Sequence, residues 1–175
     1  SDVVREVRGS RCRHFMKSAL RYFLLLSLPL YVADQVTKWL VLQYIGTDES
    51  IPVIPGVLNF VQVHNTGAAF GMLKDSNVFF ILLSTTALII VAVLAWKGTF
   101  SGILTRVGAA LLVSGILGNL TDRLLHGFVV DFLDVILPWY GHWPSFNIAD
   151  SCICVAAVLF ILEGFLPGKS RPAEG

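Results

Sequence analysis

Residues 146–165 read FNIADSCICVAAVLFILEGF and form an almost continuous apolar run. About 20 such residues are enough for a helix to cross the hydrocarbon of a bilayer. Asp150 stands near the start of the run, where a carboxylate is costly unless it is paired, hydrated or functional. The stretch therefore predicts a membrane helix and, at one end of it, a candidate functional residue.

A second aspartate has the same unusual setting. Asp131 lies in the apolar run FVVDFLD, residues 128–134. Two carboxylates on neighbouring apolar segments suggest a pair that shares one proton, which is the arrangement that activates water for peptide hydrolysis. Asp134 is the competing carboxylate, because it lies close to Asp131 in the same run.

The composition predicts an integral membrane protein. Of the 175 residues, 55% are hydrophobic and 14% are charged, which is more apolar than a typical soluble domain. No linker or change of composition divides the chain, so we expect a single membrane domain, residues 1–175. Four apolar runs, at about 19–42, 78–96, 103–120 and 148–165, approach the length of a transmembrane helix. The first run resembles a signal peptide, but no small-residue cleavage site follows it, so we expect a retained anchor.

The basic residues are distributed unevenly. Arginines and lysines crowd residues 1–18, directly before the first apolar run. Basic residues in this position favour the cytoplasmic side of a membrane, so we expect a cytoplasmic arm rather than one that binds nucleic acid. The connections at about 43–77 and 121–147 would then face outward, and both candidate aspartates would lie near the outer face.

Both outward connections contain patterns of their own. VIPG at 53–56 is a turn sequence, and residues 57–64 are rich in β-branched and apolar side chains, which predicts a short hairpin. PWYGHWP at 138–144 combines turn residues with aromatic side chains that favour the depth of the lipid headgroups. The predicted fold is an all-α integral membrane protein, with four transmembrane helices and a small antiparallel β element and loop on the outer, periplasmic face.

Polar clusters flank the apolar runs. They are DQVTK at 34–38, NTGAAF at 65–70, GNLTDR at 118–123 and FNIAD at 146–150. Each cluster alone has a structural explanation. Asp34 and Lys38 can pair along a helix. Asn147 can cap the last helix, and Asp150 can favour the dipole of that helix.

Together with VVDF at 129–132, these clusters resemble the lipoprotein signal peptidase (type II signal peptidase) family in order, in spacing and in placement on a four-span frame. The resemblance extends from about residue 22 to about residue 165. It implies an intramembrane aspartyl endopeptidase of the bacterial cytoplasmic (inner) membrane. Such an enzyme removes the signal peptide from diacylglyceryl-modified prolipoproteins by cleaving before the lipidated cysteine.

The resemblance also assigns roles to residues. Asp131 and Asp150 would be the catalytic dyad. Five further residues would support the substrate from a polar pocket, namely Asn65, Gly67, Asn119, Arg123 and Asn147. Three charged residues would be structural, namely Asp34, Lys38 and Asp122. One alternative stays open for Arg123, which could instead pair with Asp122 and only lock the end of its helix.

No cofactor or metal is expected. His64, His126 and His142 fall on the outer side and could join an aspartate in a metal site, but no HExxH motif is present and the three cysteines lack zinc-site spacing. The expected partners are a lipidated prolipoprotein and membrane lipid, with the protein acting as a monomer. A lipid-sized apolar groove should hold the substrate, and a cyclic lipopeptide that mimics the substrate should inhibit the enzyme.

A small proton- or ion-coupled transporter is the alternative function. Asp34, Asp131 and Asp150 would then form a relay for ions. A relay requires ionisable groups through the whole depth of the membrane. These residues gather near one face instead, and the second apolar run, 78–96, contains no ionisable residue. The sequence therefore favours the protease.

Overall fold

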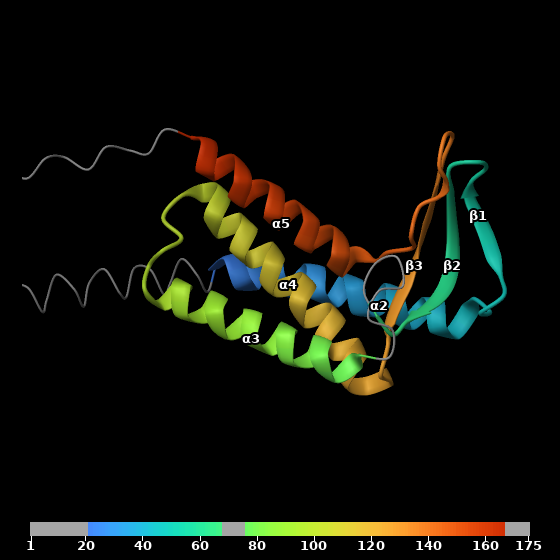
Figure 1. The fold of residues 1–175 in the computed structure, drawn as a ribbon, viewed down its shortest axis with the longest axis horizontal. Helices are drawn as coiled ribbons and strands as arrows, with labels where there is room; N and C mark the ends of the chain where they lie inside the picture. Colours follow the sequence, from blue (N-terminus) through green and yellow to red (C-terminus); the bar gives the residue numbers. More distant parts are fainter. Residues whose placement is uncertain (1–20, 68–75, 167–175) are drawn as a thin grey trace, which may run out of the picture.

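The computed structural model describes residues 21–67 and 76–166. A bundle of helices carries a small antiparallel sheet at one end (Figure 1). The elements in chain order are η1 (Phe23–Ser27), α2 (Leu28–Tyr44), β1 (Ser50–Ile54), β2 (Leu58–Asn65), α3 (Asn77–Trp96), α4 (Ile103–His126), β3 (Val129–Leu137), β4 (Gly141–His142) and α5 (Ile148–Phe165). The basic arm at 1–18 and the last three residues of the NTGAAF cluster lie outside the described residues.

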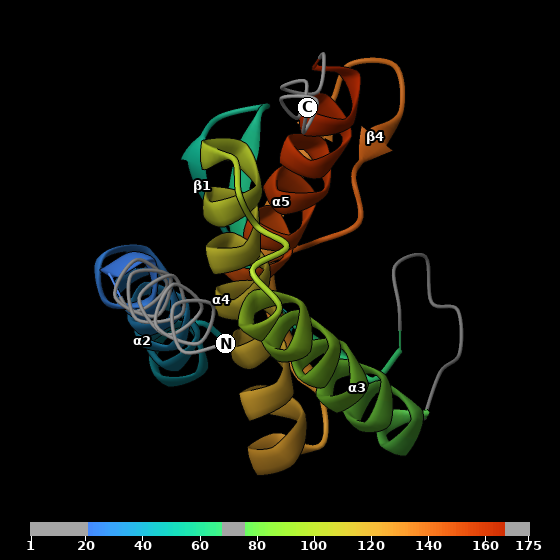
Figure 2. The same ribbon diagram turned by 90° about the vertical axis from the view of Figure 1, so that its left-hand side faces the viewer.

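Helix α4 is the centre of the bundle, since it packs against α2, α3 and α5 (Figures 1 and 2). Two glycines let the first turn of α5 approach α4 closely. A Cβ atom at Gly115 would overlap the carbonyl oxygen of Ala149, and one at Gly118 would lie 2.6 Å from Asp34 Oδ2 and 3.0 Å from the Ala149 Cβ. Small residues at a helix interface allow such close backbone approach in membrane proteins.

Three of the described helices are long and apolar enough to cross a membrane by length and composition, namely α3, α4 and α5. They differ in how far the protein itself covers them. In the most apolar 18-residue stretch of each helix, only 6% of α3 is buried inside the protein, against 39% of α4. The side chains of α3 therefore face outward over most of its surface, as expected of a helix in contact with lipid. The prediction of a mainly helical membrane protein with a small antiparallel sheet is confirmed.

Helix α4 is longer than the sequence predicted. It was expected to end near residue 120, but it continues to His126 and ends where Gly127 adopts a left-handed conformation with φ of 80°. Glycine is the residue that takes this conformation at least cost. Asp122, which was expected in the connection after this run, is instead a buried residue of the helix.

The predicted hairpin is present as β1 and β2. A third strand, β3, was not expected, because the sequence placed it in an irregular connection. β3 pairs with β2 in antiparallel register, with Val63 opposite Asp131 and Asn65 opposite Val129. Its first four residues are all buried, so it lacks the alternation of polar and apolar residues that identifies a half-exposed strand. This pairing places Asp131 beside the end of β2.

Candidate functional site

Asp131 and Asp150 line the same cavity, although one lies on strand β3 and the other in the first turn of helix α5. The cavity has a volume of about 490 Å³. Four of the five predicted supporting residues also line it, namely Asn65, Gly67, Asn119 and Arg123. The fifth, Asn147, is fully buried directly behind it and contacts both aspartates. The structure therefore brings all seven predicted site residues together.

Asn147 links the two aspartates. As the N-cap of α5 it forms a capping box, in which its side-chain oxygen accepts the Asp150 N–H at 2.9 Å and its own N–H reaches Asp150 Oδ2 at 3.3 Å. Its side-chain nitrogen donates to Asp131 Oδ1 at 2.8 Å. The structural explanation of this asparagine as a helix cap is therefore correct, and the same side chain also joins the candidate dyad.

Two further amides complete the hydrogen bonding of the carboxylates. Asn119 Nδ2 donates to Asp150 Oδ1 at 2.7 Å, and Asn65 Nδ2 donates to Asp131 Oδ2 at 2.9 Å. Asn65 is itself held because its oxygen accepts the backbone N–H of Gly67 at 3.0 Å. Among the described residues, neither aspartate forms an ion pair with a lysine or arginine. The pair is therefore supported by neutral donors.

The electrostatic setting of Asp131 favours a retained proton. Only 1% of this residue is exposed. Burial, followed by the negative charge of Asp150, raises the pKa of Asp131 to about 7, although hydrogen bonds from Asn65 and Asn147 and the charge of Lys38 oppose the shift. Asp150 is more exposed than Asp131. A carboxyl that stays protonated near neutral pH beside a second carboxyl is suited to acid–base chemistry.

Arg123 does not pair with Asp122, so the alternative role considered for it is wrong. Its guanidinium lies over the ring of Phe80, 4.7 Å from the centroid, and it donates to the carbonyl of Gly67 at 3.4 Å. Asp122 is instead bound to Lys38. Arg123 therefore connects α4 to the segment that follows β2, at the rim of the cavity.

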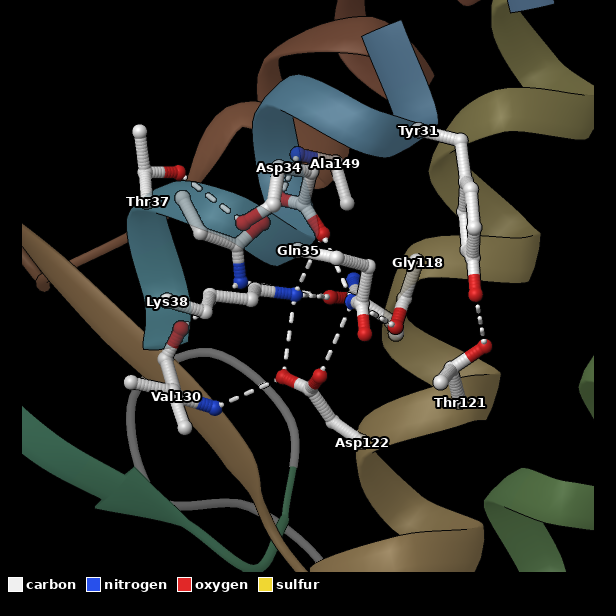
Figure 3. A network of polar contacts seen from close by, with 12 residues as sticks. Tyr31, Asp34, Gln35, Thr37, Lys38, Gly118, Thr121, Asp122, Val130 and Ala149 are labelled. Atoms are coloured by element: carbon white, nitrogen blue, oxygen red, sulfur yellow. Dashed lines mark hydrogen bonds and ion pairs between the residues drawn. The ribbon is translucent and has the colours of Figure 1, made fainter. Parts of the chain in front are cut away.

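Asp34, Lys38 and Asp122 form a buried cluster next to the cavity residues (Figure 3). Lys38 Nζ lies 2.8 Å from Asp34 Oδ2 and 3.0 Å from Asp122 Oδ2. Gln35 adds hydrogen bonds to both carboxylates, of 3.2 and 3.1 Å. The sequence analysis gave Gln35 no role, and its position one residue after Asp34 in the DQVTK cluster was the available signal.

Asp134, the competing carboxylate, does not line the cavity. It lies three residues from Asp131 on β3, and residues at this spacing point to opposite faces of a strand. Asn59 Nδ2 donates to it at 2.9 Å, and His142 Nδ1 lies 2.8 Å from it. His64 stacks on the ring of Phe128. Within the described ranges, three or more His, Cys, Asp or Glu side chains do not gather as a metal site would require.

Comparisons with known proteins find relatives over most of this chain. The family model described as signal peptidase (SPase) II matches residues 26–166. A lipoprotein signal peptidase of Syntrophotalea carbinolica is 40% identical over 163 residues, which cover 90% of this chain and 100% of the relative. A lipoprotein signal peptidase of Escherichia coli O1:K1 / APEC is 39% identical over 159 residues, which cover 88% of this chain and 94% of the relative.

Solved structures give the same result for the fold. A bacterial membrane enzyme structure obtained by the in meso method at 2.3 Å resolution superposes with a TM-score of 0.77 at 33% identity, and covers 85% of this chain and 92% of its own. A second such structure, at 1.9 Å resolution, has a TM-score of 0.74 at 34% identity, and covers 82% of this chain and 92% of its own.

Proposed function

This chain belongs to the signal peptidase II family, whose members are aspartic proteases that process lipoproteins, and we propose that Asp131 and Asp150 are its catalytic dyad. One observation carries the proposal. The two carboxylates come from different elements, line one cavity, and are joined through the side chain of Asn147. Such convergence of buried polar groups on a cavity is the usual mark of an active site.

The proposed mechanism uses one proton on the pair. The ionised carboxylate takes a proton from a water molecule, which attacks the scissile carbonyl carbon. The protonated carboxyl polarises the carbonyl oxygen, and a proton then passes to the leaving amine. The raised pKa of Asp131 supports a singly protonated pair near neutral pH, because at least one of two neighbouring carboxyls then keeps its proton.

The proposed substrate is a diacylglyceryl-modified prolipoprotein, cleaved just before its lipidated cysteine. The cavity wall supports this, because apolar side chains such as Val129, Phe146 and Ile153 surround the polar groups near the dyad. Acyl chains gain free energy by staying in an apolar groove, while only the peptide bond requires water. A cyclic lipopeptide that mimics the substrate would compete for the same cavity, and the enzyme would act as a monomer.

We further propose four transmembrane helices, with the dyad near the outer face of the bacterial inner membrane. The π-turn η1 and helix α2 continue one another, and at 1.5 Å per residue they extend about 33 Å, which is enough to span the hydrocarbon. The link between α3 and α4, with Lys97, lies at the end of the bundle opposite the sheet (Figure 1). A basic residue at that end supports a cytoplasmic location for it.

A transporter is not supported. Of the described carboxylates in the helices, Asp34 and Asp122 bind the backbone next to Asp150 and Asp131, Glu163 lies apart beside Gly102, and α3 contains no Asp, Glu, Lys or Arg. An ion relay would need such groups along the whole path.

Cleavage of a lipidated precursor by the purified protein in detergent tests the proposal. Wild-type protein should release the signal peptide, and Asp131→Asn and Asp150→Asn should each bind the precursor without cleaving it. An amide is nearly isosteric with a carboxyl but cannot exchange the required proton. Substantial cleavage by either folded variant would show that the dyad is wrongly assigned.

A further inference from the structure

Lys38 is buried behind the proposed dyad and uses its entire hydrogen-bonding capacity there. An ammonium group has three N–H donors, and Lys38 Nζ has three acceptors: Asp34 Oδ2 at 2.8 Å, Asp122 Oδ2 at 3.0 Å and Asn119 Oδ1 at 3.1 Å. Only 2% of the residue is exposed. The three acceptors in turn contact the elements that carry the dyad: Asp34 and Asn119 bind α5, and Asp122 binds β3.

The two carboxylates bound by Lys38 hold the backbone directly before each catalytic aspartate. Asp34 Oδ1 accepts the N–H of Ala149 at 2.8 Å, and Asp122 Oδ2 accepts the N–H of Val130 at 3.0 Å (Figure 3). Ala149 lies in the first turn of α5, where backbone N–H groups lack helical partners and favour a negative charge. A single cluster therefore anchors both the start of α5 and strand β3.

The third contact of Lys38 fixes an amide. Because an ammonium can only donate, Asn119 must present its oxygen to Lys38 and its NH₂ group to Asp150. The same oxygen also accepts from Asn147 Nδ2 at 3.2 Å. Asn147 is oriented in a similar way, since its own oxygen accepts the backbone N–H of Asp150 at 2.9 Å. The NH₂ group of Asn119 therefore faces Asp150, and that of Asn147 faces Asp131.

We propose that Lys38 is a positioning residue for the dyad, acting through Asn119 and through the carboxylates of Asp34 and Asp122; this rests on the proposed catalytic role of Asp131 and Asp150. Lys38 holds the Asn119 NH₂ group on Asp150, and so stabilises an ionised carboxylate there. Through its two ion pairs it also fixes the spacing between β3 and the first turn of α5.

Charge around Lys38 gives this role a measurable signature. Four carboxylates interact with its charge: Asp34 on α2, Asp122 on α4, Asp131 on β3 and Asp150 on α5. Arg123 on α4 interacts in turn with Asp122, Asp131 and Asp150. The thiol of Cys152 on α5 also interacts with Asp34. Removal of the Lys38 cation should shift the midpoints of both limbs of the activity–pH profile to higher pH. Removal of the Asp122 negative charge should shift both midpoints to lower pH. A merely structural role would move neither.

The experiment compares Lys38→Met with Asp122→Asn in detergent, by the pH dependence of kcat for cleavage of a lipidated precursor. For Lys38→Met we expect kcat at neutral pH to fall roughly 10²-fold and both midpoints to rise by about one unit. Asp122→Asn keeps the side-chain shape and should lower both midpoints, and it carries the test if Lys38→Met does not fold. Lys97→Met, a change at an exposed lysine outside the cluster, is the matched control and should keep the wild-type profile.

The outcomes separate the two proposals. Midpoints that rise in Lys38→Met and fall in Asp122→Asn support the positioning role. Wild-type midpoints in folded Asp122→Asn, with only a lower melting temperature, would overturn it, while the dyad would stand as long as Asp131→Asn remained inactive. Cleavage by Asp131→Asn would instead refute the proposed dyad, and the positioning role with it.

Discussion

Two pairs of aspartates, Asp34 with Asp122 and Asp131 with Asp150, have opposite surroundings. Asp34 and Asp122 share the Lys38 ammonium within 3.0 Å, and each also accepts a backbone N–H. Asp131 and Asp150 accept hydrogen bonds from amide groups of the described residues and line a cavity. The first pair therefore holds a cation between its carboxylates, whereas the second pair is held by neutral donors. The contrast separates a scaffold from a site that can exchange protons.

The dyad should show the largest mutational effect. We expect Asp131→Asn and Asp150→Asn each to reduce kcat by at least about 10³-fold, because each change removes the only proton exchange that the reaction can use at that position. If the two residues act as a unit, the double variant should be hardly slower than either single variant. Single-turnover cleavage measures this, and losses that multiply in the double variant would contradict a shared mechanism.

The pH dependence should sharpen the same contrast. The pKa of Asp131 is raised to about 7, so the dyad should lose its last proton above that pH, and kcat should fall about tenfold per pH unit there. The folded protein also holds this proton at pH values where the unfolded chain has released it. Its stability should therefore fall between about pH 4, near the unfolded value, and about pH 7.

Melting temperatures test the stability half of that prediction. Asp131→Asn cannot titrate, so its melting temperature relative to wild type should be higher at pH 8 than at pH 5. Comparing one variant at two pH values cancels any constant effect of the new amide. A relative melting temperature that is the same at both pH values would show that Asp131 has an ordinary pKa in the folded protein.

Gly118→Ala should damage the scaffold rather than the chemistry. A Cβ atom there would lie 2.6 Å from Asp34 Oδ2 and 3.0 Å from the Ala149 Cβ. Overpacking of this kind costs about 1–3 kcal/mol, so we expect a clear fall in melting temperature. Gly164→Ala is the matched control, because a Cβ at that helical position meets nothing within 4 Å. Equal melting temperatures for the two variants would show that α4 and α5 can move apart at this point without a loss of stability.

The sequence predicted which polar residues lie together better than it predicted the fold around them. Carboxylates are so costly in apolar surroundings that Asp131 and Asp150 stood out by their position in apolar runs of the sequence. The strand β3 was missed because it is buried and continuously apolar, and because its pairing partner β2 lies far away in the sequence. That partner also supplies the hydrogen bond from Asn65, 66 residues from Asp131.

The end of α4 was missed for a related physical reason. A cluster of polar residues after an apolar run often indicates a loop, but here Asp122 points into the protein beside Asn119, and Lys38 binds both side chains. Their polarity belongs to the buried networks of the site rather than to solvent. The ion pair between Asp34 and Lys38 was predicted from helical spacing, whereas the contacts of Gln35 depend on tertiary structure alone.

Asp134 should show the smallest effect, although it lies on the same strand as Asp131. Its ion pair with His142 involves a side chain that is 67% exposed, and exposed ion pairs contribute roughly 0–1 kcal/mol. Asp134→Asn would keep an acceptor for Asn59 and leave the cavity unchanged. Asp134 is buried but lies outside the cavity. We therefore expect kcat within about twofold of wild type, because sites that share no partners usually act independently. An inactive Asp134→Asn enzyme beside an active Asp131→Asn enzyme would mean that β3 presents its other face to the substrate.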